Sequence, residues 1–418
     1  MRDVLPDEVA TWQHVEQVVR DVLSAYAYKE VRLPVVEVAE LFTHAIGDAT
    51  DVVSKEMYTF ADRSGEQLSL RPEGTAGCVR AVIQNGLVHR GGPGHKLWYQ
   101  GPMFRYEKPQ RGRYRCFNQI GAEVYGFPGP GVDAELVCLC ARIWRLLGLE
   151  GIRLEVNTLA TRDTRDTYRA VLLDYFQANA DQLDADSQVR LEKNVLRILD
   201  SKNPEMRDLI EQAPALIDYL DTESEQHFGQ FCELLDTAGV AYTVNPRLVR
   251  GLDYYSRTVF EFITESLGAQ GTICGGGRYD YLVEQQGGPP TPAVGFSMGL
   301  ERIVELVSLK TPVSGVQPHV YVVARGEVAV SAAFGLCERL RDELPWLRIE
   351  QNAGGGSFKA QFKRADRSGA SFAMVIGEGE VQQQLVSLKS LRTDDEQAQV
   401  AMDALSKELN TLRAQSRL

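Results

Sequence analysis

The sequence predicts an α+β protein in two parts: a mostly antiparallel sheet flanked by helices and interrupted by a helical insertion, followed by a C-terminal α/β domain. Stretches rich in β-branched and aromatic residues lie on both sides of an acidic segment with helical periodicity, residues 157–245. The last hundred residues read as a strand (320–324), a helix (329–343), a strand, a helix, two strands and a helix, which is an α/β pattern. The two parts meet at a connection containing Pro, Gly and Ser, residues 308–318.

Composition and charge limit the possible functions. Residues 316–418 carry 13 Lys/Arg and 13 Asp/Glu, so the formal charge of −12 lies on the first 315 residues and any nucleic acid must bind at local basic patches. No apolar run approaches the roughly 20 residues that span a bilayer, and no secretory segment opens the chain. The seven cysteines are an odd number without CxxC spacing. We therefore expect reduced thiols in a cytoplasmic protein that does not bind membranes.

The first elements predict packing and an exposed edge. Pro6 followed by acidic residues predicts a helix start, and apolar residues from Trp12 to Tyr26 recur at helical spacing. The segment around Pro34 predicts a short strand, which its proline confines to a sheet edge or an interface. An exposed edge invites a partner chain.

A strand-to-helix corner follows. The pattern alternates from Gln67 to Arg71, breaks at Pro72 and becomes helical after Thr75. Glu73 and Thr75 therefore either present polar groups to a cleft or simply cap the helix.

A hairpin with a basic loop comes next. One strand ends at Arg105, and the other runs from Tyr114 to Gly126. Against the single acid Glu107, the basic residues of this region are Arg105, Lys108, Arg111, Arg113 and Arg115. The loop either binds phosphate or a nucleic-acid end, or is a solvated turn.

The second strand of the hairpin predicts a polar face. A period of two places Gln119, Gly121 and Glu123 on one side and apolar residues on the other. The glycine leaves room for a small ligand, and the amide and carboxylate could bind an ammonium or a ring N–H. The alternative is a solvated sheet face.

Two further arginines occur beside predicted strands. Arg250 precedes the strand Thr258–Ile263, and Arg302 lies in the first turn of a helix after the strand Ala293–Met298. A buried cation needs an anion, which for Arg250 is a ligand unless Asp253 pairs with Arg250 or Arg257 in a structural ion pair. A cation at a helix start is unfavourable for the helix dipole unless it meets an anion or stays solvated.

Nucleotide binding would depend on arginines. The sequence has neither a Walker GxxxxGK[ST] nor a strand-following GxGxxG with its acidic partner. Arg105, Arg250 and Arg302 could together neutralise and align a polyphosphate. In the C-terminal domain, a predicted helix has its phenylalanines on one side, and Lys359, Lys363 and Arg364 lie off that side, which indicates a nucleic-acid footprint.

These motifs resemble those of the histidyl-tRNA synthetase family, in class II of the aminoacyl-tRNA synthetases, over essentially the whole chain. FRYEKPQRGRYR (104–115), VGFSMGLER (294–302) and the segment around Pro34 resemble the three class motifs. LVRGLDYY (248–255) and GGGRYD (275–280) resemble the two histidine-specific signatures, which are far more specific. One departure is Lys108, where many bacterial relatives have arginine; another is the start at MRDVLP, because relatives usually carry several residues before that proline signature.

The resemblance implies an organisation and an activity. A class II catalytic domain would comprise residues 1–157 and 247–312, with a helical insertion at 158–246 and an anticodon-binding domain at 317–418. The chain would form a homodimer and ligate L-histidine to tRNA-His through a histidyl-adenylate. ATP would be a co-substrate with Mg²⁺, and no permanently bound metal with protein ligands is expected.

The resemblance also implies residue roles. Arg105 would hold the α-phosphate and the substrate carboxylate, Arg250 would stabilise charge during adenylate formation, and Arg302 would hold the γ-phosphate. Histidine would bind to Glu73, Gly74, Thr75, Arg105, Gln119, Glu123, Arg250, Tyr254, Tyr255 and Tyr279. Within this set, the α-ammonium would contact Glu73, Thr75 and Gln119, and the imidazole would contact Glu123 and Tyr255. ATP would bind to Arg105, Glu107, Arg113 and Arg302. The tRNA would bind to Lys108, Gln110, Lys359 and Lys363.

Two alternatives have other functions. One is the histidine-sensing, non-catalytic regulatory paralogue found in short-form ATP phosphoribosyltransferase, which lacks the anticodon domain and typically degrades the signatures. The other is a generic ATP-dependent amide ligase, which leaves the tyrosine signatures unexplained.

Overall fold

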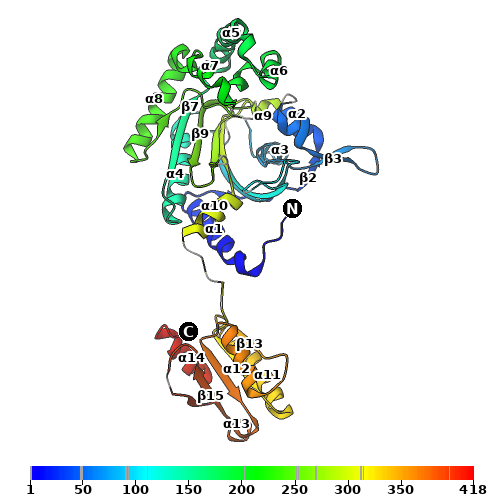
Figure 1. The fold of residues 1–418 in the computed structure, drawn as a ribbon, viewed down its shortest axis with the longest axis vertical. Helices are drawn as coiled ribbons and strands as arrows, with labels where there is room; N and C mark the ends of the chain where they lie inside the picture. Colours follow the sequence, from blue (N-terminus) through cyan, green and yellow to red (C-terminus); the bar gives the residue numbers. More distant parts are fainter. Residues whose placement is uncertain are drawn as a thin grey trace. The chain divides into compact units, whose positions relative to one another are not determined.

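The computed structural model describes residues 2–47, 50–89, 92, 94–110, 112–201, 203–250, 252, 254–268, 271–310, 313, 315–394 and 396–418 (Figure 1). The chain divides into two compact units, Met1–Ser314 and Gly315–Leu418.

An eight-stranded sheet forms the centre of the first unit. Its order is β1-β5-β6-β11-β10-β9-β7-β8. The bounds are β1 Lys29–Glu30, β5 His95–Phe104, β6 Cys116–Tyr125, β7 Ile152–Thr158, β8 Thr243–Val244, β9 Ser256–Thr264, β10 Thr272–Arg278 and β11 Ala293–Gly299. All neighbours are antiparallel except the edge pairs β1·β5 and β7·β8. The predicted antiparallel catalytic sheet is confirmed, with parallel pairing confined to its two edges.

Helices cover both faces of this sheet. Their bounds are α1 Pro6–Ala25, α2 Ala39–Ile46, α3 Thr75–Gln84, α4 Gly131–Leu146, α9 Leu282–Gln285 and α10 Leu300–Lys310, with a π-helical turn at Val52–Glu56. Helices α1, α4 and α10 share one apolar core with Ile120, Ala122 and Val124 of β6. The predicted alternation of β6 is therefore confirmed, and its polar residues face the other way. The predicted stripe of α1 is also confirmed, since Val15 and Val19 are fully buried.

A small sheet of order β2-β4-β3 lies within the same unit. Its strands are β2 Val36–Val38, β3 Tyr58–Ala61 and β4 Gln67–Leu70. Strand β2 is at the edge, as Pro34 predicted, and Val36 and Val38 are exposed.

The chain between β7 and β9 is mostly helical, as predicted. Its helices are α5 Arg162–Ala178, α6 Ala185–Lys193, α7 Arg207–Gln212 and α8 Thr222–Thr237, with 3₁₀ turns at Ala180–Gln182, Val195–Asp200, Pro204–Met206 and Leu216–Tyr219. These green helices gather next to β7 and β9 in Figure 1.

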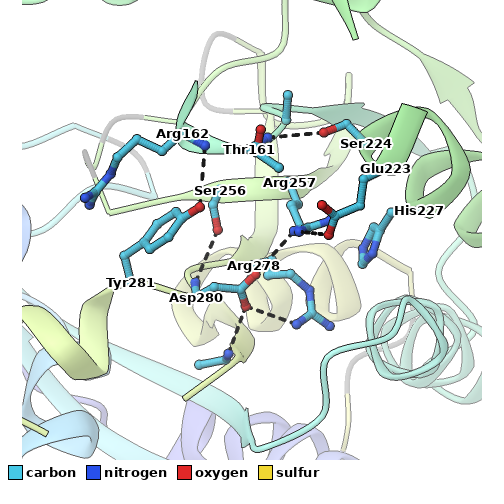
Figure 2. Close-up of polar contacts among 12 residues, drawn as sticks. Thr161, Arg162, Glu223, Ser224, His227, Ser256, Arg257, Arg278, Asp280 and Tyr281 are labelled. Carbon is cyan, nitrogen blue, oxygen red and sulfur yellow. Dashed lines mark hydrogen bonds and ion pairs between the residues drawn. The ribbon is translucent and has the colours of Figure 1, made fainter. Parts of the chain in front are cut away.

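Polar contacts join the base of this helical segment to the sheet (Figure 2). Arg257 of β9 pairs with Glu223 of α8, and the backbone N–H of Arg162 donates to the Tyr281 hydroxyl over 3.4 Å. The guanidinium of Arg162 also lies 4.4 Å from the centre of the Tyr281 ring. The start of α5 is thereby fixed relative to the loop that follows β10.

The second unit is a five-stranded sheet of order β13-β12-β14-β15-β16 with its own helices. The bounds are β12 Val320–Ala324, α11 Glu327–Glu343, β13 Ile349–Gln351, α12 Phe358–Arg367, β14 Phe372–Ile376, α13 Glu378–Gln383, β15 Leu385–Ser390, β16 Ala398–Ala401 and α14 Leu405–Ala414. The sequence predicted two strands after α12, which is wrong, because three strands and the short α13 follow it. Helix α13 buries none of its residues and therefore gives no apolar periodicity to detect.

Candidate active site

The three predicted arginines lie in one cleft of about 410 Å³ on the sheet face opposite α1, α4 and α10. Arg105 directly follows β5, Arg250 precedes β9, and Arg302 is in the first turn of α10. The other predicted ligands that line the cleft are Glu73, Thr75, Glu107, Arg113, Gln119, Tyr254 and Tyr255. Strands β5 and β9 flank β6, β11 and β10 in the sheet. Arg105 and Arg250 therefore approach the cleft from its two sides.

Arg250 is held from two sides. It pairs with Glu261 of β9, and its guanidinium lies 5.4 Å from the centre of the Tyr255 ring. It lies over Gly275, where an added Cβ would come within 2.5 Å of its Nη1. Burial alone would lower its pKa, but Glu261 and Tyr255 raise it, so Arg250 stays charged.

The predicted ion pair between Asp253 and Arg250 falls on a residue outside the described ones. The carboxylate that meets Arg250 comes from β9 itself. Arg257, the other arginine considered for Asp253, pairs with Glu223 and Asp280.

Arg105 and Arg302 are anchored by backbone carbonyls. Arg105 donates through Nε to the carbonyl of Pro72 over 2.9 Å. Arg302 donates through Nε to the carbonyl of Gly112 over 3.0 Å and through Nη1 to the carbonyl of Thr272. Burial and the positive charge of Arg113 lower the pKa of Arg302, an effect that an anion in the cleft would oppose.

Glu73 fills both roles that the sequence left open. Its carboxylate accepts from the backbone N–H groups of Thr75 (2.6 Å) and Ala76 (2.8 Å), which caps α3, and it also lines the cleft. Burial raises its pKa while the two backbone hydrogen bonds oppose the rise. The neighbouring Gly74 does not line the cleft; an added Cβ there would overlap the ring of Tyr99.

Glu123 lies beneath the cleft lining. It is 1% exposed and accepts hydrogen bonds from the hydroxyls of Thr75 (2.8 Å), Tyr99 (2.9 Å) and Tyr279. Burial raises its pKa to about 8 although these hydrogen bonds oppose the rise. Neither Glu123 nor Tyr279 is among the residues that line the cleft.

One sequence expectation about this face is wrong. The space left by Gly121 holds the ring of Tyr99, which an added Cβ at Gly121 would overlap, so it is not open to a ligand. Gln119, in contrast, has a buried side-chain oxygen, Oε1, that no donor among the described residues reaches.

Some residues of the basic loop line the cleft and others do not. Arg113 forms an ion pair with Glu107, and both line the cleft. Lys108 and Gln110 are exposed and do not line it. Arg111 is outside the described residues. In the second unit, Lys359 and Lys363 are both exposed on α12.

The sequence reasoning missed Glu261, Tyr99 and Glu301. Glu301 lines the cleft and accepts from the backbone N–H of Asn118 over 2.8 Å. Of these three residues, only Glu261 gave a signal in the sequence, because it is a carboxylate within an otherwise apolar strand. Over the described parts of the chain, no group of three or more His, Cys, Asp or Glu could hold a metal ion, and no helix is long and apolar enough to span a bilayer.

Arg278, within the GGGRYD signature, has a structural position. It is fully buried and donates to Asp133, to the carbonyls of Phe127 and Gly129, and to Asp280. Figure 2 shows its contact with Asp280. Arg278 therefore joins β10 to the start of α4 and does not face the cleft.

The cleft combines three arginines with an antiparallel sheet, and that combination is typical of the class II aminoacyl-tRNA synthetases. Within that class, the chain belongs to the histidyl-tRNA synthetase family. The family model for histidyl-tRNA synthetase matches residues 1–303, and a model of an anticodon binding domain matches residues 319–412. The predicted resemblance is confirmed.

Individual relatives agree with this membership. The chain is 58% identical over 406 residues to a protein of Alkalilimnicola ehrlichii named histidine–tRNA ligase, covering 97% of this chain and 93% of the relative. It is similar to the crystal structure of apo histidyl-tRNA synthetase from S. aureus (TM-score 0.82, 32% identity), covering 98% of this chain and 97% of that one. The histidyl-tRNA synthetase of Nostoc sp. PCC 7120 shares the fold (TM-score 0.67, 20% identity, 98% of both chains).

Proposed function

We propose that this chain ligates L-histidine to tRNA-His at the expense of ATP, through a histidyl-adenylate, and releases AMP and diphosphate. The observation that carries the proposal is the gathering of Arg105, Arg250 and Arg302 in one cleft with the polar groups of Gln119 and Tyr255. Family membership and the similarity to histidine–tRNA ligase support it.

In the first step, the histidine carboxylate attacks the α-phosphorus of ATP, and the bond to diphosphate breaks. Negative charge develops on the α-phosphate, where Arg250 and Arg105 stabilise it. Because Glu261 and Gly275 hold Arg250 in place beforehand, little reorganisation is needed at the moment of reaction. Arg302, with Arg113 beside it, holds the terminal phosphate.

The amino acid is held by complementary polar groups. Its ammonium binds between Glu73, Thr75 and Gln119, and the unpaired Oε1 of Gln119 fits a donor at this point. The imidazole binds against Tyr255 and replaces one of the hydroxyl donors of Glu123. A site that hydrogen-bonds the ring nitrogens rejects amino acids that leave those groups unpaired.

ATP and Mg²⁺ fit the remaining groups of the cleft. Burial raises the pKa of the Glu301 carboxylate, so this group would gain from a nearby cation. Mg²⁺ bound with ATP would neutralise phosphate charge and needs only one or two protein carboxylates.

The organisation follows from the same proposal. Residues 1–157 and 247–312 form the catalytic domain, 158–246 the insertion and 317–418 the anticodon-binding domain. Lys108 and Gln110 meet the acceptor end of tRNA, while Lys359 and Lys363 bind it elsewhere. The exposed edge of β2 joins two copies in a homodimer. The seven free cysteines are consistent with the cytoplasm, where the substrates are found.

Exchange of labelled diphosphate into ATP, measured with each of the twenty amino acids, tests the activity. We expect exchange with histidine alone, followed by transfer to tRNA-His. Absence of exchange with every amino acid would favour the regulatory paralogue, which is less well supported because all three arginines and the C-terminal unit are present.

A further inference from the structure

A second, strongly basic pocket opens from the active-site cleft toward the insertion. It has a volume of about 180 Å³ and shares Arg197, Arg250, Leu252 and Tyr255 with the cleft. Its other lining residues are Leu159, Arg165, Arg169, Lys193, Asn194, Leu196 and Val249. Apart from Arg250, four cationic side chains line this pocket, and none of its lining residues is acidic.

Arg165 is the half-buried cation that α5 contributes to this pocket. It donates to the backbone carbonyl of Tyr255, so it connects α5 directly to a residue of the active-site cleft. The start of α5 that sets its position is fixed by the contacts of Arg162 with Tyr281 (Figure 2). Burial lowers the pKa of Arg165, and the positive charges of Arg162 and Arg169 act in the same direction. A bound anion would offset all three effects.

Acidic groups compensate the pocket only in part. Arg169 lies 3.8 Å from Asp166, a distance beyond an ordinary hydrogen bond. Within the described parts of the chain, Lys193 contacts no carboxylate. Arg250 pairs with Glu261, so its charge is compensated and it is not included in the proposed group of cations. All charged residues that line the pocket are cationic, and the pocket lies next to the reacting groups.

We propose that Arg165, Arg169, Lys193 and Arg197 form a phosphate subsite adjoining the adenylate site. With less than half the volume of the main cleft, the pocket takes a phosphate group and not a whole nucleotide. Guanidinium and ammonium groups together suit phosphate oxygens. The subsite deepens the proposed function, on which it rests, and the phosphate comes from the 3′ end of the tRNA or from the diphosphate released in the first step.

The test uses the full chain with Arg169→Ala and Lys193→Ala combined. Both side chains are exposed, so their removal should not unfold the protein. Arg207→Ala is the matched control, because Arg207 is an exposed arginine of the same insertion that does not line the pocket. Three quantities are measured for each protein: histidine-dependent exchange, inhibition of tRNA charging by inorganic diphosphate, and the Kd of deacylated tRNA-His as a function of salt.

If the phosphate belongs to tRNA, the double variant raises the Kd of tRNA roughly tenfold and lowers the salt slope by about 0.7 per lost contact, while exchange and diphosphate inhibition stay as in Arg207→Ala. If it belongs to diphosphate, the inhibition constant rises roughly tenfold and the Kd of tRNA stays unchanged.

A double variant that matches Arg207→Ala in both the Kd of tRNA and diphosphate inhibition overturns the subsite. Failure of the proposed function is distinguishable, because the unmodified protein would then show no histidine-dependent exchange at all.

Discussion

Gly275→Ala should disable Arg250 without removing it. The added Cβ would lie 2.5 Å from Nη1 of Arg250, whereas ordinary contact begins at 3.4 Å, so the guanidinium must retreat by about 0.9 Å. A misplacement of about 1 Å near the chemistry can cost 10²-fold in rate, or about 2.7 kcal/mol of activation free energy. Because the clash meets the end of a long side chain, the cost in stability should be much smaller.

The assay is histidine-dependent exchange of diphosphate into ATP, with thermal unfolding followed by circular dichroism as the check on folding. Gly131→Ala is the control, since an added Cβ there meets nothing within 4 Å. Arg250→Ala sets the limit and should lose on the order of 10² to 10³-fold. The reasoning is refuted if Gly275→Ala exchanges at the normal rate, or if its melting temperature falls as steeply as its activity.

Three further predictions address recognition and assembly. Glu123→Gln should lower kcat/KM for histidine by on the order of 10²-fold while KM for ATP hardly changes. Burial raises the pKa of Glu123 from 4.5 to about 8, so between these pH values the folded protein holds a proton that the unfolded chain has lost. The free energy of unfolding should therefore fall as the pH rises from 4.5 to 8. This part of the fall should be absent in Glu123→Gln. Val36→Lys, on the exposed edge of β2, should halve the mass seen by light scattering, and an unchanged mass would exclude that edge as the dimer interface. A chain of the first 316 residues, if folded, should keep histidine-dependent exchange but charge tRNA poorly. In the full chain, Lys359→Ala combined with Lys363→Ala should reduce the salt slope of tRNA binding by roughly one unit per lost phosphate contact.

Much of the sheet and its three arginines could be predicted because the signals are local. A period of two along β6 separates Gln119 and Glu123 from the apolar core, and a permanent charge beside a strand stands out in any sequence. Those signals do not depend on which strands become neighbours.

The contacts that shape the site depend on strand neighbours and could not be predicted. Tyr99 fills the space at Gly121 because the two residues are paired across β5 and β6. The same layering places Glu123 under Thr75 and Tyr279, out of the cleft lining, although the sequence placed it among the ligands. A glycine on a strand shows that space is needed but not which neighbour occupies it.

Strand order also constrains when the site can be assembled. Strand β11 is the last strand of the large sheet in the chain, yet it lies between β6 and β10 in the middle of that sheet. Arg105 belongs to the half made first and Arg250 to the half made later, and only β11 joins the two. During synthesis, a chain that has not reached residue 299 can form two partial sheets with unpaired edges but no continuous floor beneath the arginines. The last strand of the large sheet to leave the ribosome thus completes both that sheet and the cleft.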